Sequence, residues 1–180
     1  MSTPKLHWML WLILTVVLIG CTRGDLIAVG SPAPELVGVA PDGKRVALST
    51  LRGQPVVVYF YPKDNTSGCT TEACGFRDAY GQYQLRHVEI FGVSRDSKES
   101  HEEFRREHKL PFVLVADSNG SIAKAYGVGS IFGLNARVTF LIGPDGKVAR
   151  VWPDVTPATH PKEVLAAVDS LPRLPAEAAP

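Results

Sequence analysis

The sequence is short of cysteine and has no strong excess of charge of either sign. Only three of its 180 residues are cysteines, which excludes a small scaffold held together by several disulfides. Lysine and arginine (19) nearly balance aspartate and glutamate (18), so the composition does not favour nucleic acid or an anionic membrane surface as a partner. The sequence also shows no internal repeat and no long run of like charges. The few cysteines are therefore the most informative residues.

The N-terminus has the features of a secretory signal. Residues 6–20 are mainly apolar and contain no acidic residue, and Lys5 precedes them. This run is shorter than the roughly 20 residues that a membrane-spanning helix needs, and Gly20 offers the small side chain that a signal peptidase requires. We therefore expect residues 1–20 to be a signal peptide that directs export.

Cys21 follows this segment directly. The sequence Leu18-Ile19-Gly20-Cys21 resembles the lipobox of bacterial lipoproteins, in which the cysteine thiol accepts a diacylglycerol. The resemblance implies a lipid anchor at Cys21 and a membrane-anchored location on the periplasmic side or in the cell envelope of a bacterium. Two other interpretations remain open: an ordinary signal peptide followed by an unrelated cysteine, and a short uncleaved anchor.

The rest of the chain has the length of one domain with a full core. We expect residues 21–34 to form a lipidated N-terminus and a mobile linker, because residues 30–34 read Gly-Ser-Pro-Ala-Pro. Residues 35–171 would form the domain. Residues 172–180, which are rich in proline and alanine, would form a flexible tail.

Strand-like and helix-like segments alternate within the domain. Residues 55–61 and 89–94 are runs of mainly Val, Ile and aromatic residues, which is typical of strands covered on both faces. A charged amphipathic pattern predicts a helix over residues 97–109, in which Ser100 and Glu103 have the spacing of a capping box. The other predicted elements are a strand pair joined by residues 41–44, a strand at 111–117, a helix at 121–126, a hairpin at 138–152 and a helix at 161–171. This order predicts an α/β, thioredoxin-like fold with a mixed central sheet flanked by helices.

Cys69 and Cys74 follow the strand at 55–61, where reactive groups gather in such sheets. Cys69 would lie in the first turn of a helix that begins near Thr66 or Ser67, and the positive end of a helix favours the nucleophilic thiolate. On an ideal helix, residues five apart have α-carbons about 8.7 Å apart, whereas a disulfide needs them within about 7 Å. A bond between the two sulfur atoms would therefore require local unwinding.

The residues around these cysteines resemble the active-site pattern of an enzyme family. Pro62-x-x-x-Thr66-x-x-Cys69 is similar to the pattern of peroxiredoxins. Residues 59–78 resemble the Q-type branch, also called bacterioferritin comigratory proteins, of the alkyl hydroperoxide reductase and thiol-specific antioxidant superfamily. Residues 92–94, 100–104, 110–112 and 137–142 agree as well, and the resemblance covers residues 31–171. Ser67 stands where this branch commonly has proline, and Gly143 stands where it has aspartate.

The resemblance implies a thiol-dependent peroxidase that reduces hydrogen peroxide and organic hydroperoxides. Cys69 would attack the peroxide and become a sulfenic acid, and Cys74 would resolve it to an intramolecular disulfide. Thr66 would hydrogen-bond the thiolate and the peroxide. Pro62 would shield the pocket. Arg137 would hold the thiolate in its charged form and stabilise the leaving oxygen.

The same resemblance implies which partners the chain needs. It implies no metal, haem or nucleotide cofactor, and a thioredoxin-like protein would supply the reducing equivalents. We expect a monomer, because the resolving cysteine belongs to the same helical region as Cys69. The membrane would be contacted through the lipid anchor at Cys21.

Three other interpretations of the cysteine pair stand beside the peroxidase. Cys69 and Cys74 could form a structural disulfide, which is common in exported proteins, although closing so short a loop stabilises little. A copper-binding lipoprotein of thioredoxin-like fold would use both thiolates and a histidine, since soft thiolates suit Cu(I). Its cysteines are normally closer together, and only His160 lies late enough to join them. A disulfide oxidoreductase is disfavoured because the Cys-x-x-Cys pair is missing.

Overall fold

The computed structural model describes residues 25–172. The predicted signal peptide, Cys21 and residues 173–180 of the predicted tail lie outside the described residues. Within the described part, no helix has both the length and the apolar character that crossing a bilayer requires.

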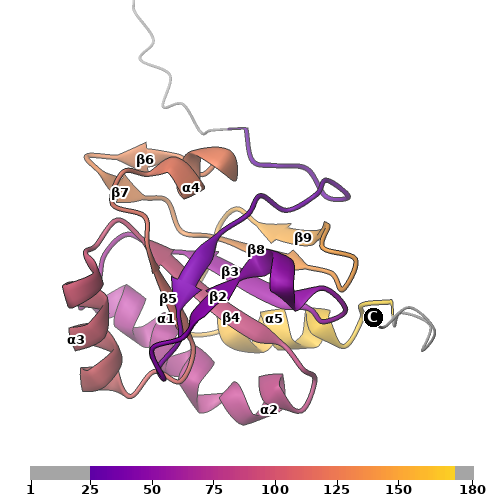
Figure 1. Cartoon of the computed structure of the whole chain (residues 1–180), viewed down its shortest axis with the longest axis horizontal. Helices are drawn as coiled ribbons and strands as arrows, with labels where there is room; N and C mark the ends of the chain where they lie inside the picture. The colour runs from indigo at the N-terminus through magenta and orange to yellow at the C-terminus, as the bar shows by residue number, and fades with distance from the viewer. Residues whose placement is uncertain (1–24, 173–180) are drawn as a thin grey trace, which may run out of the picture.

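A seven-stranded mixed sheet forms the centre of the molecule. Its strands are β1 (Val37–Val39), β2 (Arg45–Ala47), β3 (Val56–Phe60), β4 (Glu89–Ser94), β5 (Val113–Ala116), β8 (Val138–Ile142) and β9 (Val148–Trp152). They lie in the order β2-β1-β5-β4-β3-β8-β9 (Figure 1). Strands β3, β4 and β5 run parallel, and β8 pairs antiparallel with β3. A separate hairpin consists of β6 (Ser130–Ile131) and β7 (Leu134–Asn135).

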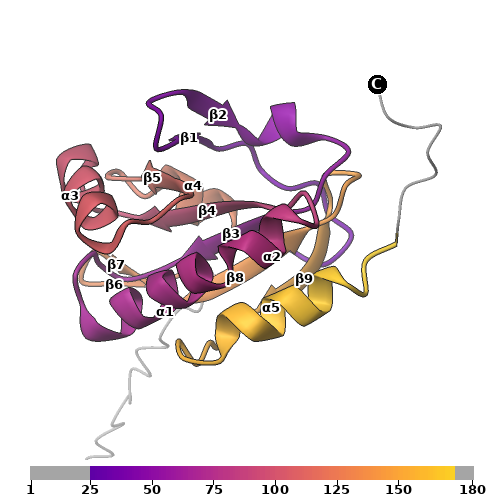
Figure 2. The same ribbon diagram turned by 90° about the horizontal axis from the view of Figure 1, so that it is seen from below.

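Helices cover both faces of this sheet (Figures 1 and 2). They are α1 (Ser67–Asp78), α2 (Tyr80–Gln84), α3 (Lys98–His108), α4 (Ser121–Ala125) and α5 (His160–Val168), with a 3-10 turn η1 at Leu48–Leu51. Successive side chains of a strand point to opposite faces of the sheet. Because both faces are covered here, all five residues of β3 are buried. Tyr59 packs with Phe76 of α1 on one face, and Phe60 packs with Tyr126 on the other. The thioredoxin-like arrangement predicted from the sequence is confirmed.

The N-terminal capping of α3 differs from the prediction. Ser97 is the N-cap residue, and its side-chain oxygen accepts a hydrogen bond from the backbone nitrogen of Ser100. The hydroxyl of Ser100 instead donates to Asp64 at 2.7 Å. The predicted capping box of Ser100 and Glu103 is therefore wrong, because Ser97 caps the helix and the distant Asp64 carboxylate accepts the Ser100 hydroxyl proton.

Residues 25–34 are packed on the domain, although the sequence predicted a mobile linker there. The backbone nitrogen of Ile27 donates to the carbonyl of Tyr126 at 3.2 Å, and that of Gly30 donates to Val148 at 2.7 Å. The nitrogen of Ala33 also bonds Gly146 at 3.0 Å. Composition could not show that β9 and its turn offer backbone partners to this segment.

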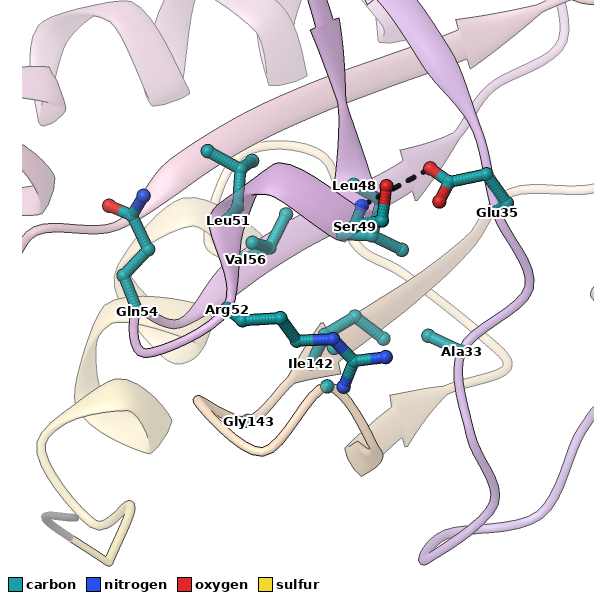
Figure 3. Close-up of a pocket in the computed structure, with 11 residues that line it drawn as sticks. Ala33, Glu35, Leu48, Ser49, Leu51, Arg52, Gln54, Val56, Ile142 and Gly143 are labelled. Carbon is teal, nitrogen blue, oxygen red and sulfur yellow. Dashed lines mark hydrogen bonds between the residues drawn. The ribbon is translucent and has the colours of Figure 1, made fainter. Parts of the chain in front are cut away.

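Ala33 of this segment and the adjacent Glu35 line a pocket of about 60 Å³ beside η1 (Figure 3). The Glu35 carboxylate accepts a hydrogen bond there from the backbone nitrogen of Ser49 at 3.2 Å. Gly143, one of the two departures from the Q-type pattern, lines the pocket at the end of β8 that is remote from Arg137. The departure therefore lies away from the predicted catalytic residues.

Candidate active site

The register of two strands brings Arg137 to the end of β3. Phe60 at the end of β3 pairs with Val138 at the start of β8. Because the two strands are antiparallel, Arg137 lies across from Tyr61, and the loop of residues 62–66 then leads into α1. Residues that are about 70 positions apart in the sequence therefore meet at one edge of the sheet.

Cys69 lies in the first turn of α1, as predicted, and its side chain is buried with 1% exposed. The Nη2 group of Arg137 donates a hydrogen bond to the Cys69 sulfur at 3.2 Å. A guanidinium and a helix N-terminus both favour a thiolate over a thiol. The site can therefore hold a negatively charged sulfur in a position shielded from bulk water.

Glu72 is a functional residue that the sequence analysis missed. Its carboxylate is fully buried and forms a close ion pair with Nη1 of Arg137. Burial raises the pKa of Glu72 to about 7, and the charge of Arg137 opposes this rise. Burial likewise works against the charge on Arg137, but the Glu72 carboxylate and the Cys69 sulfur together outweigh burial and raise the pKa of Arg137.

Glu72 therefore fixes the guanidinium that contacts the Cys69 sulfur. The signal for this role was present in the sequence, because residues three apart on a helix lie on the same face. Glu72 is three residues after Cys69, so its carboxylate lies on the same face of the helix, within reach of a cation that contacts Cys69.

Cys74 lies on the same helix but in a different environment. Its side chain is partly exposed, whereas Cys69 is buried, and both thiols are free. Asp78 raises the pKa of Arg77, and Cys74 beside it contributes in the same direction. With both residues helical, their α-carbons stand about 8.7 Å apart, which is too far for a disulfide. The structure is therefore that of the reduced form.

Thr66 and Pro62, which the family resemblance singled out, lie in the loop before α1. Thr66 is the N-cap residue of α1, and its hydroxyl donates to the carbonyl oxygen of Lys63 at 3.0 Å. The hydroxyl oxygen keeps lone pairs that can accept a further hydrogen bond. Pro62 is half-buried and lies two residues beyond the end of β3.

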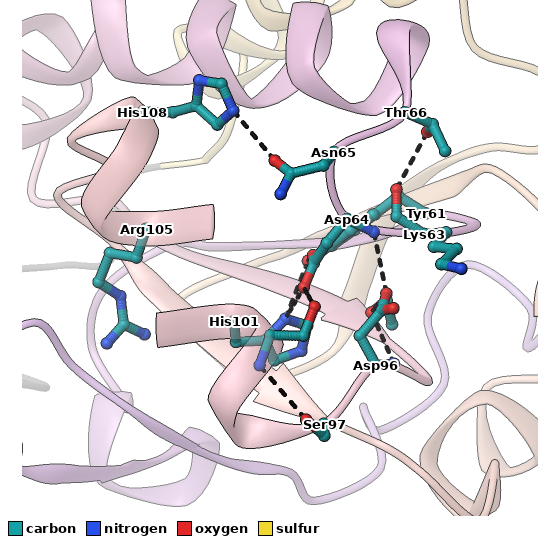
Figure 4. A network of polar contacts seen from close by, with 12 residues as sticks. Tyr61, Lys63, Asp64, Asn65, Thr66, Asp96, Ser97, His101, Arg105 and His108 are labelled. Carbon is teal, nitrogen blue, oxygen red and sulfur yellow. Dashed lines mark hydrogen bonds and ion pairs between the residues drawn. The ribbon is translucent and has the colours of Figure 1, made fainter. Parts of the chain in front are cut away.

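Asp64 is the centre of a buried polar network that holds this loop (Figure 4). Its carboxylate accepts hydrogen bonds from the Tyr61 and Ser100 hydroxyls, both at 2.7 Å, and contacts Nδ1 of His101 at 2.9 Å. Burial alone would raise the pKa of Asp64, but the hydrogen bonds from His101, Tyr61 and Ser100 outweigh burial and lower it. The backbone nitrogen of Asp64 also donates to Asp96 at 2.9 Å. The network ties the loop to β3, to α3 and to the segment after β4.

Asn65 provides a second attachment of the loop to α3. Its backbone is in the left-handed region, with φ of 56°, a conformation that asparagine tolerates better than most residues. Its side-chain oxygen lies 3.1 Å from Nε2 of His108. Two histidines of α3, His101 and His108, therefore brace the segment that precedes Cys69.

The structure does not support the copper-binding alternative. Among residues 25–172 there is no group of three or more His, Cys, Asp or Glu side chains that could hold a metal ion. His160, the histidine that such a site would need, bonds the Thr139 hydroxyl at 2.8 Å, and burial lowers its pKa to about 4. The Arg137 guanidinium also occupies the place beside the Cys69 sulfur, where a cation would have to bind.

The buried thiol, its guanidinium and the thioredoxin-like sheet define a class of protein. Residues 29–151 match the AhpC/TSA family, and the chain belongs to that family. Peroxiredoxin Bcp of Bacillus subtilis (strain 168) is 40% identical over 146 residues, which are 77% of this chain and 93% of that protein. The chloroplastic peroxiredoxin Q of Oryza sativa subsp. japonica is 40% identical over 148 residues, which are 81% of this chain and 68% of that protein.

Solved structures give the same result. A structure of peroxiredoxin Q from Xanthomonas campestris has a TM-score of 0.70 and 34% identity, covering 83% of this chain and 99% of the other. A structure of the bacterioferritin comigratory protein of the same organism has a TM-score of 0.69 and 35% identity, covering 75% and 90% of the two chains. Within the AhpC/TSA family, the similarity is therefore to the Bcp and Q peroxiredoxins, which confirms the resemblance found in the sequence.

Proposed function

We propose that this chain reduces hydrogen peroxide and organic hydroperoxides through Cys69 and Cys74. Membership of the peroxiredoxins supports a thiol-dependent peroxidase. The single observation that carries the assignment of residues is the hydrogen bond from Arg137 to the buried sulfur of Cys69 at 3.2 Å, in the first turn of α1. This environment activates one of the two cysteines and leaves the other partly exposed.

The first step is attack of the Cys69 thiolate on the terminal oxygen of the peroxide. An S–O bond forms as the O–O bond breaks, and the two electrons that reduce the peroxide come from sulfur. The product alcohol, or water from hydrogen peroxide, leaves after taking up a proton, and Cys69 becomes a sulfenic acid. Arg137 stabilises the thiolate and the charge that develops on the leaving oxygen.

Thr66 and Pro62 act on the substrate side of this step. The lone pairs of the Thr66 hydroxyl, at the N-cap of the helix that carries Cys69, can accept a hydrogen bond from the peroxide. Donation to the thiolate requires the hydroxyl proton to turn away from the Lys63 carbonyl. Pro62 shields the sulfur at the end of β3.

The second step joins the two cysteines. The Cys74 thiol loses its proton and attacks the sulfur of the sulfenic acid. An S–S bond forms as the S–O bond breaks, and the leaving hydroxide takes up a proton to become water. Since both cysteines lie in α1, the helix must unwind between them before the sulfur atoms can meet. Gly68 and Gly75, on either side, lower the cost of this change.

The disulfide is then reduced by a protein of the thioredoxin type.

We propose a monomer, because both cysteines belong to one helix and no second chain is needed to join them. Sedimentation of the reduced and oxidised protein should give the mass of one chain in both states.

We further propose that the chain is an exported lipoprotein anchored through Cys21. The apolar run of residues 6–20 and the lipobox-like sequence before Cys21 support this location. Labelled fatty acid should enter the full-length protein in a bacterial host and should not enter Cys21→Ser. Equal labelling of both proteins would refute the anchor.

The peroxidase is tested by treating the reduced protein with one equivalent of hydrogen peroxide. Rapid loss of two thiols and of two mass units is expected for the parent protein, because two hydrogen atoms leave when the disulfide forms. Cys69→Ser should lose this reaction, and Cys74→Ser should stop at a sulfenic acid. If Cys69→Ser consumes peroxide as fast as the parent, the assignment of Cys69 is wrong.

A further inference from the structure

The β6–β7 hairpin exposes apolar side chains in the part of the chain that leads to Arg137. Its tip residue Phe132 is 100% exposed, and Ile131 and Leu134 are 59% and 43% exposed. Six large apolar side chains are exposed among residues 25–172. Three of the six are these hairpin residues, which lie within four consecutive positions of the sequence. An exposed apolar cluster of this kind marks a surface for a partner or a membrane.

The conformation of Phe132 is unusual for a bulky residue. Phe132 and Gly133 have φ values of 52° and 79°, so the hairpin turns with both central residues in the left-handed region. Such turns favour Asn-Gly, and a bulky side chain at a positive φ is energetically unfavourable. The chain therefore keeps a phenylalanine where the local backbone prefers asparagine, which points to a function for the exposed ring.

The described chain begins beside this hairpin. The backbone of Asp25 packs so closely on Gly127 that a Cβ there would lie 2.0 Å from the Asp25 carbonyl oxygen. Gly127 is three residues before β6, and the chain from Gly127 to Phe132 can span at most about 17 Å. Figure 1 shows the start of the described chain and the hairpin at the same end of the molecule.

Cys21 is four residues before Asp25, so these two residues can be at most about 14 Å apart. Residues 25–34 are hydrogen-bonded to the domain and add no slack to this tether. A lipid on Cys21 would therefore hold this end of the domain against the bilayer.

The charge of the segment also suits a lipid surface. Residues 125–136 contain no charged side chain. No carboxylate of this segment would repel an anionic headgroup, and no ion would have to be desolvated as the tip entered the interface.

We propose that the β6–β7 hairpin inserts Phe132, with Ile131 and Leu134, into the interface of the bilayer, and that the enzyme thereby acts on hydroperoxides of membrane phospholipids. This inference rests on the proposed peroxidase and on the proposed anchor at Cys21. Arg137 is two residues beyond the end of β7, so a hairpin seated on the membrane keeps the Cys69 site close to the bilayer surface.

The test uses the full chain, lipidated in a bacterial host and reconstituted in phosphatidylcholine vesicles. Phe132→Asn removes the apolar side chain and suits the left-handed backbone, so folding is not placed at risk. Leu85→Asn is the matched control, because Leu85 is 74% exposed and follows α2 at the opposite end of the molecule (Figure 1).

Phe132→Asn should react at least about fivefold more slowly with phosphatidylcholine hydroperoxide in the vesicles, because it loses the apolar contact that orients the site. Its rate with hydrogen peroxide in water should equal that of the parent. Leu85→Asn should change neither rate. Equal rates of Phe132→Asn and the parent with the lipid substrate overturn the proposal, and so does a loss with both substrates.

A second measurement does not depend on activity. The fluorescence added by Phe132→Trp should be quenched by brominated phosphatidylcholine, whereas that added by Leu85→Trp should not. If the parent fails to react with hydrogen peroxide but this quenching occurs, the peroxidase fails and the membrane contact stands. Absence of quenching overturns the proposed membrane contact. A parent protein that is a dimer and becomes a monomer in Phe132→Asn also overturns it, because the hairpin would then be an interface between two copies.

Discussion

Two sources of positive charge act on the sulfur of Cys69. The N-terminus of α1 gives a partial charge, and Arg137 gives a full one at hydrogen-bonding distance. Glu72 fixes the position of that guanidinium from the same helix. The arrangement of Cys69, Glu72 and Arg137 therefore depends on the planar guanidinium of Arg137, which contacts the sulfur and the carboxylate with different nitrogen atoms.

Replacing Arg137 tests this dependence. Arg137→Met should slow the reaction of reduced protein with peroxide by about 10²–10³, the usual cost of removing one donor that stabilises a developing charge. Arg137→Lys should fall between, because an ammonium cannot span Cys69 and Glu72 with a rigid fork. Stopped-flow single-turnover kinetics measure both rates. An unchanged rate in Arg137→Met would remove Arg137 from the mechanism.

Glu72 predicts a dependence of stability on pH. Its folded pKa is raised to about 7, so its contribution to stability is full below the ordinary value of 4.5 and is lost as the pH rises through about 7. Relative to Glu72→Gln, the parent should therefore lose up to about 3 kcal/mol in free energy of unfolding between pH 4.5 and pH 8, given the pKa of about 7.

Urea denaturation of both proteins at the two pH values measures this difference, and other titrating groups cancel in the comparison. A difference between the parent and Glu72→Gln that does not vary with pH would contradict the buried carboxylate described here.

At the scale of elements, α1 is packed tightly on α5, while the proposed disulfide requires the same helix to unwind. A Cβ on Gly75 would lie 2.9 Å from Cγ of Pro161 in α5. Gly75 is therefore needed for the close approach of the two helices, and it is the residue directly after Cys74.

Gly75→Ala should destabilise the reduced protein by about 1–3 kcal/mol through overpacking against Pro161. Gly81→Ala is the matched control, because Gly81 lies in α2 and nothing lies within 4 Å of a Cβ there. That change should stabilise the protein by about 0.5–1 kcal/mol, since alanine favours helix. Chemical denaturation measures both values, and a Gly75→Ala protein as stable as the parent would mean that the helices are not in such close contact.

The sequence predicted the regular elements better than their ends. Strands β3, β4 and β8 and the start of α1 were predicted because continuous apolar runs and the cysteine motif mark them. Helix α5 ends at Val168, three residues before the predicted end, and α2 and the β6–β7 hairpin were not predicted. Each missed element is short, with five residues or fewer, so it shows little periodicity.

At the scale of the whole molecule, the site is assembled from distant segments. Arg137 reaches Cys69 because β3 pairs with β8, and no local sequence pattern shows this pairing. Arg137 was therefore predicted only through the resemblance to peroxiredoxins. The brace of Asp64 by His101 spans 37 residues and depends on where α3 packs, which no local pattern encodes. The packed segment of residues 25–34 was missed for the same reason.

The central claim is that Cys69 and Cys74 are held apart on α1 and that peroxide joins them by unwinding this helix. Hydrogen exchange of backbone amides across the whole chain tests it most directly, before and after one equivalent of hydrogen peroxide. We predict faster exchange in α1 after oxidation, unchanged protection in β3, β4 and β8, and no change in α1 when Cys74→Ser is treated in the same way. Unchanged protection of α1 in an oxidised protein that carries the Cys69 to Cys74 disulfide would contradict the account.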